Sequence, residues 1–202
     1  GANNHVDGTT MKEKLPWLGV MRLDYMYLDV GCVLLAAAAA IYTHGRINLF
    51  YLLLAFVGGI SAHIGVNALN EYLDFRSGLD FTTNRTPFSG GTGTLPNRPD
   101  LAPVALGIAV SGLSITVLVG LYFWLVRGWP IVPLGLLGLL LILTYTTWIT
   151  RLPALTLINT GTGFGLLMVT GTYYVLTGAF SWPAFFAALP PFFLGNNLQL
   201  LN

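Results

Sequence analysis

Residues 70–80, NEYLDFRSGLD, place three carboxylates and an amide close enough together to form one site. Asn70, Glu71 and Asp74 fall within little more than one helical turn, and Asp80 follows shortly after them. Carboxylates this close repel one another unless a cation neutralises them. Because all these side chains offer oxygen atoms, the expected ion is a hard one: Mg²⁺, or else Mn²⁺ or Ca²⁺. Asn70, Glu71, Asp74 and Asp80 are therefore the candidate metal ligands.

The polar stretch that follows contains the candidate anion-binding residue. We expect residues 75–100 to form a cytoplasmic cap loop, because TTNRTPFSGGTGTLPNRP is rich in glycine and proline and too polar for lipid. Within this loop Arg85 could grip phosphate oxygens through its planar guanidinium group. The run SGGTG at 89–93 could form a phosphate-binding nest or only a flexible hinge. No Gly-Lys-Ser/Thr follows it, so the run is not a nucleotide P-loop.

The rest of the chain has the composition of a membrane protein. Of its 202 residues, 54% are hydrophobic and 8% charged, and the mean hydropathy is +0.70; soluble domains carry about 25% charged residues. The apolar runs are continuous and long enough for a hydrocarbon core of about 30 Å, which predicts helices rather than barrel strands. The predicted spans are 24–43, 48–74, 101–126, 129–149, 153–177 and 182–201. Residues 1–10 are interpreted as a cloning remnant, which leaves 11–202 as one all-α transmembrane domain.

The distribution of basic residues predicts the orientation in the membrane. If the chain crosses at every span, seven of the nine Lys and Arg residues lie on one side, and Arg46 and Arg127 lie on the other. The positive-inside rule makes the first side cytoplasmic. The acidic cluster of residues 70–80 lies on that side, so the active face is expected to be cytoplasmic.

Polar residues of the second span recur at helical spacing. His63, Asn67, Asn70 (or Glu71) and Asp74 follow one another at intervals of three and four residues, which places them on one stripe of the helix. Since a charged side chain is costly in lipid, such residues usually face a bundle interior or a wet cavity. The stripe therefore predicts a cavity that opens to the cytoplasm.

Other intramembrane residues have simpler interpretations. Asp29 could touch the cavity, but a pair with Arg22 is expected, and His63 is expected to bond to a neighbouring helix. Small residues in AAAAA at 36–40 and in NTGTGFGLLMVTGT at 159–172 predict close helix packing.

Two stretches carry a resemblance to a known family. NALNEYLDFRSGLDFTTNRTPFSGG at 67–91 resembles the first aspartate-rich motif of the UbiA superfamily of intramembrane prenyltransferases. The motif is most similar to the form N-D-x-x-D-x-x-x-G-x-D of the branch that prenylates dihydroxynaphthoate in menaquinone synthesis. Asn70, Asp74, Gly78 and Asp80 match this form, and Glu71 stands where an Asp is usual. TGTYYVLTGAFSWPAFFAALPPFFLGNNLQLLN, which runs to residue 202, resembles the fifth and sixth helices of the same branch.

The resemblance implies a bundle of nine helices around a central cavity, of which six are expected here. A second aspartate motif, which the family has at the end of its sixth helix, is expected to begin at about Asn202. The chain is therefore interpreted as an N-terminal portion that is inactive alone, and Asn202 is a candidate substrate-binding residue. Arg151 is similar in placement to a basic residue that contacts diphosphate in the family, although it could serve only as a positive-inside anchor.

The function that the resemblance implies is the transfer of a prenyl group inside the membrane. Its partners would be an isoprenyl diphosphate, an aromatic or lipid acceptor and membrane lipid, with Mg²⁺ as cofactor and no nucleic acid. Asp74, Asp80 and Arg85 are the expected catalytic residues. Two alternatives are a cation channel or transporter that uses the polar stripe, and a CDP-alcohol phosphotransferase, although the D-G-x-x-A-R run of the latter is absent. The acceptor and the length of the prenyl chain stay open.

Overall fold

The apolar runs of the sequence form helices in the computed structural model, which describes residues 15–78, 92–147 and 160–200. Within these ranges every regular element is helical. Two 3₁₀ turns, η1 (Pro16–Met21) and η2 (Leu23–Tyr25), lead into the first long helix. The longer elements are α2 (Met26–His44), α3 (Leu49–Ser77), α5 (Ala102–Arg127), α6 (Ile131–Thr147), the π-helical segment η6 (Thr162–Met168), α8 (Val169–Thr177) and α9 (Trp182–Leu200).

These elements confirm the predicted all-α membrane bundle. Each of the six predicted spans corresponds to a helix, and η6 and α8 together form the fifth. Residues 153–159 of the fifth predicted span lie outside the described residues. Among the residues that the structure describes, three helices have the length and hydropathy to cross a membrane: Leu23–His44, Leu49–Ser77 and Pro99–Arg127. The protein is thus built as an integral membrane helical bundle.

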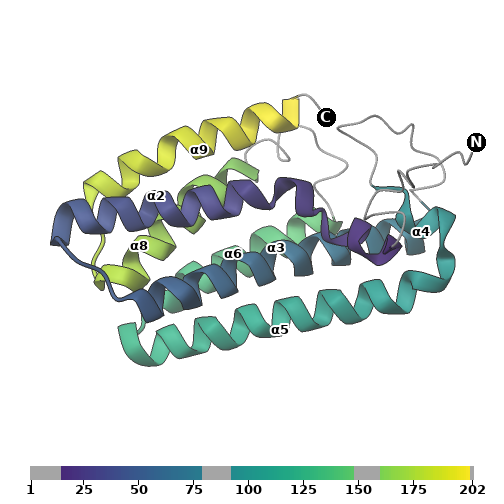
Figure 1. The fold of residues 1–202 in the computed structure, drawn as a ribbon, viewed down its shortest axis with the longest axis horizontal. Coiled ribbons are helices and arrows are strands. Elements are labelled where there is room, and N and C mark those ends of the chain that lie inside the picture. Colours follow the sequence, from purple (N-terminus) through teal and green to yellow (C-terminus); the bar gives the residue numbers. More distant parts are fainter. Residues whose placement is uncertain (1–14, 79–91, 148–159, 201–202) are drawn as a thin grey trace, which may run out of the picture.

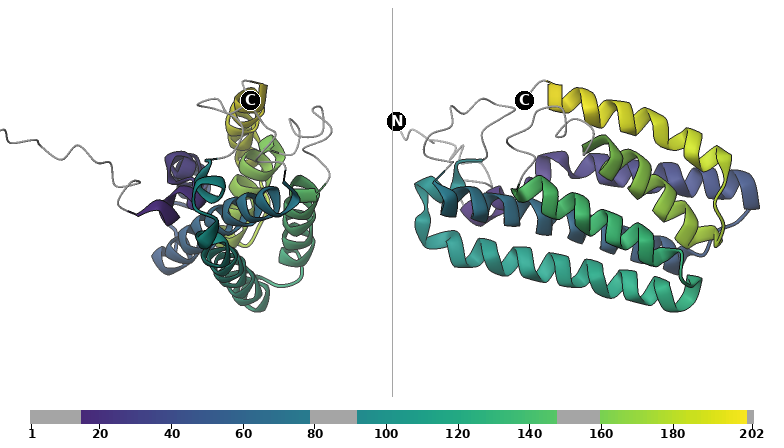
Figure 2. Two further views of the ribbon diagram at one scale, coloured as in Figure 1. Left: turned by 90° about the vertical axis from the view of Figure 1, so that its right-hand side faces the viewer. Right: turned by 180° about the vertical axis from the view of Figure 1, so that it is seen from behind.

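The helices run alternately up and down the bundle (Figure 1). The start of α2, the end of α3, the start of α5 and the end of α9 lie on the side of the short helix α4 (Thr94–Asn97). We call this side the α4 end. Seen from behind, α6 and α8 lie between α5 and α9 (Figure 2). Polar residues from segments far apart in sequence are therefore brought together at the α4 end.

Close backbone contact joins α3 to α5. A Cβ atom added to Gly112 would lie 2.7 Å from the carbonyl oxygen of Ser61 and 2.9 Å from the Cα of Gly65. Glycine is thus required at this crossing, because any side chain would force the two helices apart. Thr116 adds a hydroxyl that donates to the carbonyl of Gly58, 3.3 Å away.

Small residues of α2 form the packing surface for α8 and α9. Ala36, Ala37 and Ala40 are buried in one cluster with Tyr173 of α8 and Ala188 of α9. This agrees with the close packing predicted for residues 36–40. The π-helical segment η6 also lies very close to α9, since a Cβ atom added to its Gly165 would overlap the backbone of α9.

Arg127 fixes the end of the bundle opposite α4. Its Nε donates to the carbonyl of Val175 and its Nη2 to that of Leu176, each at 2.8 Å. The guanidinium carbon lies 4.9 Å from the centre of the Tyr51 ring, within the range of a cation–π interaction. This basic residue therefore binds the last carbonyl groups of α8, where the helix dipole favours a cation.

Candidate functional site

The candidate site begins with the length of α3. The side chain of Asn48 caps its start by accepting from the N–H groups of Phe50 and Tyr51, and Gly78 ends it in the left-handed conformation (φ 78°). At 1.5 Å per residue, the 29 residues of α3 extend about 44 Å, whereas a hydrocarbon core is about 30 Å thick. The last turns of α3, which carry Glu71 and Asp74, can therefore reach beyond the apolar layer.

Asn70 and Asp74 lie one helical turn apart on this part of α3. Asn70 is buried, with 8% of its surface exposed, and Asp74 is partly buried. One turn earlier on α3, Nδ2 of Asn67 donates to the carbonyl of His63 at 2.8 Å, so the side-chain amide of Asn67 is bonded within the helix. The pair of Asn70 and Asp74 supplies an amide oxygen and a carboxylate, which is the donor chemistry that suits Mg²⁺.

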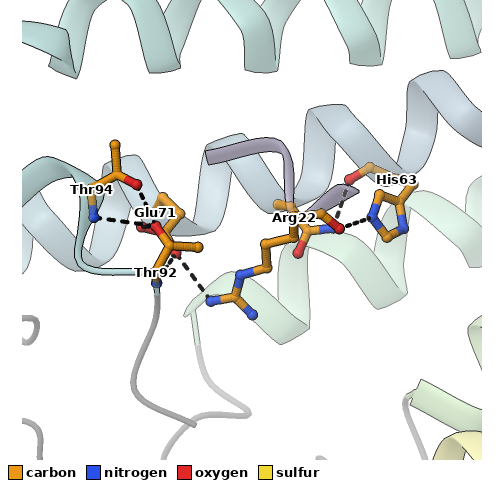
Figure 3. A network of polar contacts seen from close by, with 6 residues as sticks. Arg22, His63, Glu71, Thr92 and Thr94 are labelled. Carbon is orange, nitrogen blue, oxygen red and sulfur yellow. Dashed lines mark hydrogen bonds and ion pairs between the residues drawn. The ribbon is translucent and has the colours of Figure 1, made fainter. Parts of the chain in front are cut away.

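Glu71, predicted as a metal ligand, is itself buried and accepts hydrogen bonds from Arg22 and Thr92 (Figure 3). Its Oε1 accepts from Nη2 of Arg22 at 3.2 Å and from the backbone N–H of Thr92 at 2.8 Å. Its Oε2 accepts from the hydroxyl of Thr92 at 3.0 Å. The hydroxyl groups of Thr92 and Thr94 lie 2.8 Å apart. Both oxygens of Glu71 are thus occupied by protein donors.

A second buried pair lies deeper in the bundle. Nδ1 of His63 on α3 is 2.7 Å from Oδ2 of Asp29 on α2. Nε2 of His63 lies 3.2 Å from the carbonyl oxygen of Arg22. The expected contact of His63 with a neighbouring helix is confirmed. The prediction that Asp29 pairs with Arg22 is wrong. The carboxylate of Asp29 pairs with the imidazole of His63, and the guanidinium of Arg22 pairs with Glu71.

The segment predicted as a cap loop at 75–100 is more regular than expected. Residues 75–77 still belong to α3, Thr94–Asn97 form α4, and Pro99–Leu101 form a 3₁₀ turn. Arg98 is exposed and pairs with Asp100 through two bonds of 2.8 and 2.7 Å. The other predicted site residues, Asp80, Arg85, Arg151 and Asn202, and most of the SGGTG run, lie outside the described residues.

Within residues 15–78, 92–147 and 160–200, no three His, Cys, Asp or Glu side chains gather as a metal site. Asn70 and Asp74 fit as part of an oxygen ligand set, because they are adjacent on one helix face and lie at its polar end.

Sequence reasoning missed the partners of Glu71. Arg22 is predicted to pair with Asp29, Thr92 is assigned only to the run SGGTG, and Thr94 only to the predicted cap loop. The contact depends on the approach of η1 to α4: a Cβ atom on Gly19 would overlap the hydroxyl of Thr94. A glycine at position 19 gives no signal of this contact when the sequence is considered alone.

The comparison with protein families agrees with this architecture. Residues 30–201 match the model of the UbiA prenyltransferase family, and this match includes α3 with Asn70 and Asp74. No curated protein and no solved structure matches the chain. Since the family model covers most of the helical bundle, the chain belongs to the UbiA prenyltransferase family of membrane transferases.

Proposed function

We propose that the protein transfers a prenyl group from an isoprenyl diphosphate to an aromatic or lipid acceptor within the membrane, with Mg²⁺ as cofactor. The observation that carries this proposal is the placement of Asn70 and Asp74 one turn apart at the polar end of α3, within the matched region. Asn70, Asp74 and Asp80 are the residues that would hold the metal. Bound there, Mg²⁺ would neutralise the negative charge of the diphosphate.

The reaction breaks the bond between the allylic carbon of the prenyl chain and the diphosphate oxygen. The electron pair leaves with the diphosphate, and the cationic allylic carbon is attacked by an electron-rich atom of the acceptor. A proton leaves the acceptor to complete the substitution. Arg85 and Arg151 would bind the oxygens of the leaving group, where positive charge stabilises the transition state. Asn202 would contact the substrate head group.

The helical bundle contributes the surroundings of the reaction. Its apolar side chains can accommodate the prenyl chain and keep water from the allylic cation. We propose an aromatic acceptor of the dihydroxynaphthoate type, as in menaquinone synthesis, because Asn70, Asp74, Gly78 and Asp80 match the motif of that branch. The positive-inside distribution supports a cytoplasmic active face.

The experiment measures prenyl transfer to dihydroxynaphthoate by the full-length protein in lipid nanodiscs, across a Mg²⁺ titration. Asp74→Asn removes a negative ligand at constant shape, so it should abolish most of the turnover while the protein stays folded. Asp100→Asn is the matched control, because Asp100 is exposed and pairs with Arg98; its turnover should equal that of the wild type.

Turnover that is independent of Mg²⁺ and insensitive to Asp74→Asn would refute the assigned site. A cation flux through liposomes without prenyl diphosphate would instead support the channel alternative.

A further inference from the structure

We propose that Glu71 is a positioning residue and not a metal ligand: it holds Arg22 and Thr92 against the turn of α3 that carries Asn70 and Asp74. This inference rests on the proposed function, since it assigns a role beside that metal site. It starts from a carboxylate that is 1% exposed and whose two oxygens accept three hydrogen bonds from two other segments.

The charge around Glu71 supports this role. The guanidinium of Arg22 already neutralises the carboxylate at 3.2 Å. A metal ion bound to the same oxygens would meet a second cation at contact distance, which is electrostatically unfavourable. It would also displace Thr92, whose backbone N–H and hydroxyl both donate to Glu71. Glu71 is therefore better suited to bind protein donors than to bind Mg²⁺.

The partners of Glu71 come from two places that frame the site. Arg22 is the left-handed residue (φ 48°) between η1 and η2, and its carbonyl oxygen faces His63 of α3. Thr92 is the first described residue after Asp80 and Arg85 in the chain and leads directly into α4. By holding Thr92, Glu71 fixes the start of the described segment that leads into α4 to the polar end of α3.

Contacts of Thr94 also join η1 to the start of α4. Gly19 of η1 leaves room for the hydroxyl of Thr94. That hydroxyl contacts the hydroxyl of Thr92 at 2.8 Å, and the N–H of Thr94 donates to the Thr92 hydroxyl at 3.2 Å. The N-terminal turns, α3 and the start of α4 thus meet around one buried carboxylate (Figure 3).

The test separates positioning from metal binding with two readouts that need no turnover. One is the affinity of the nanodisc-embedded full-length protein for Mn²⁺ alone, measured by electron paramagnetic resonance. The other is hydrogen–deuterium exchange of the peptide that contains the Thr92 amide. Glu71→Met removes both acceptors at similar length, and Glu71→Gln is the milder variant that keeps one oxygen acceptor.

Substitutions of Glu71 and of Asp74 should each change a different readout. Glu71→Met should speed exchange at Thr92 tenfold or more and change Mn²⁺ affinity less than twofold. Asp74→Asn should weaken Mn²⁺ binding at least tenfold and leave exchange at Thr92 unchanged. Asp100→Asn should alter neither measurement, since Asp100 lies in an exposed pair with Arg98.

Kinetics provide a third readout through Thr92. Thr92→Val removes the hydroxyl that donates to Oε2 of Glu71. Both Thr92→Val and Glu71→Gln should lower kcat. Because both variants break one network, the double variant should lose less than the product of the two single losses.

Mn²⁺ affinity that falls as far in Glu71→Gln as in Asp74→Asn would overturn the positioning role and make Glu71 a ligand. Unchanged exchange at Thr92 in Glu71→Met would also overturn it. If the wild-type protein binds no Mn²⁺, the proposed function fails, and the exchange result still decides whether Glu71 holds Thr92.

Discussion

Nη2 of Arg22 meets Oε1 of Glu71 at 3.2 Å, across 49 residues of sequence. Glu71 is almost completely buried, whereas the side chain of Arg22 is 26% exposed. The N-terminal turns are thereby fastened to the polar end of α3, beside the candidate metal ligands. Loss of either partner would leave the other charge poorly compensated, which is far more costly than the loss of a surface ion pair.

Arg85→Lys tests whether Arg85 binds the diphosphate. The change keeps the positive charge and the topology but removes the planar guanidinium fork. Loss of one charged hydrogen bond of about 1.5–3 kcal/mol should slow prenyl transfer roughly ten- to a hundredfold. The measurement is kcat/KM for the diphosphate, with insertion confirmed by protease accessibility. Wild-type kinetics would reduce Arg85 to a topology anchor.

The buried pair of Asp29 and His63 should act as a unit in stability. Replacement of His63 by Leu leaves the carboxylate of Asp29 buried without its partner, and such a break costs about 3–5 kcal/mol. The double variant Asp29→Leu/His63→Leu should be more stable than the single variant His63→Leu, because no buried carboxylate is left without its partner. SDS-induced unfolding followed by tryptophan fluorescence measures these differences. Strictly additive losses would show that the two side chains are not coupled.

The α3–α5 crossing should be sensitive to a single methyl group. Gly112→Ala places its Cβ 2.7 Å from the carbonyl oxygen of Ser61 and should lower the free energy of unfolding by about 1–3 kcal/mol, as overpacking does. Gly120→Ala is the matched control on the same helix, since its Cβ would meet nothing within 4 Å. Thermal unfolding by circular dichroism compares the two. Equal stability of both variants would contradict the close crossing.

Arg127→Lys should destabilise the end of the bundle opposite α4. Lysine keeps the charge but cannot reproduce both guanidinium bonds to the carbonyls of Val175 and Leu176. A loss of about 1.5–3 kcal/mol is expected, the range for one hydrogen bond to a charged group. Arg46→Lys, at an exposed position, should leave thermal stability unchanged. An unaffected Arg127→Lys variant would show that the charge alone is sufficient.

The sequence by itself determined the fold class and the location of the candidate site. Continuous apolar runs can satisfy their backbone groups in lipid only as helices or closed barrels, so composition and run length predict the helical spans. The spacing of Asn70 and Asp74 likewise places them on one face of α3, because helical geometry is local. The hydrogen bonds of a helix join residues i and i+4, so they form within a short stretch of sequence and do not depend on distant segments.

Only the tertiary structure decided how the charged residues are paired. Several ion pairs are possible among the charged side chains of Arg22, Asp29, His63 and Glu71. The spacing of these residues in the sequence does not determine which of the pairs forms. The selection depends on the crossing of α2 with α3, on the left-handed turn at Arg22 and on the approach of η1 to Thr94. The energy of a buried charge depends on which donors surround it in space, and that arrangement arises only when the helices pack.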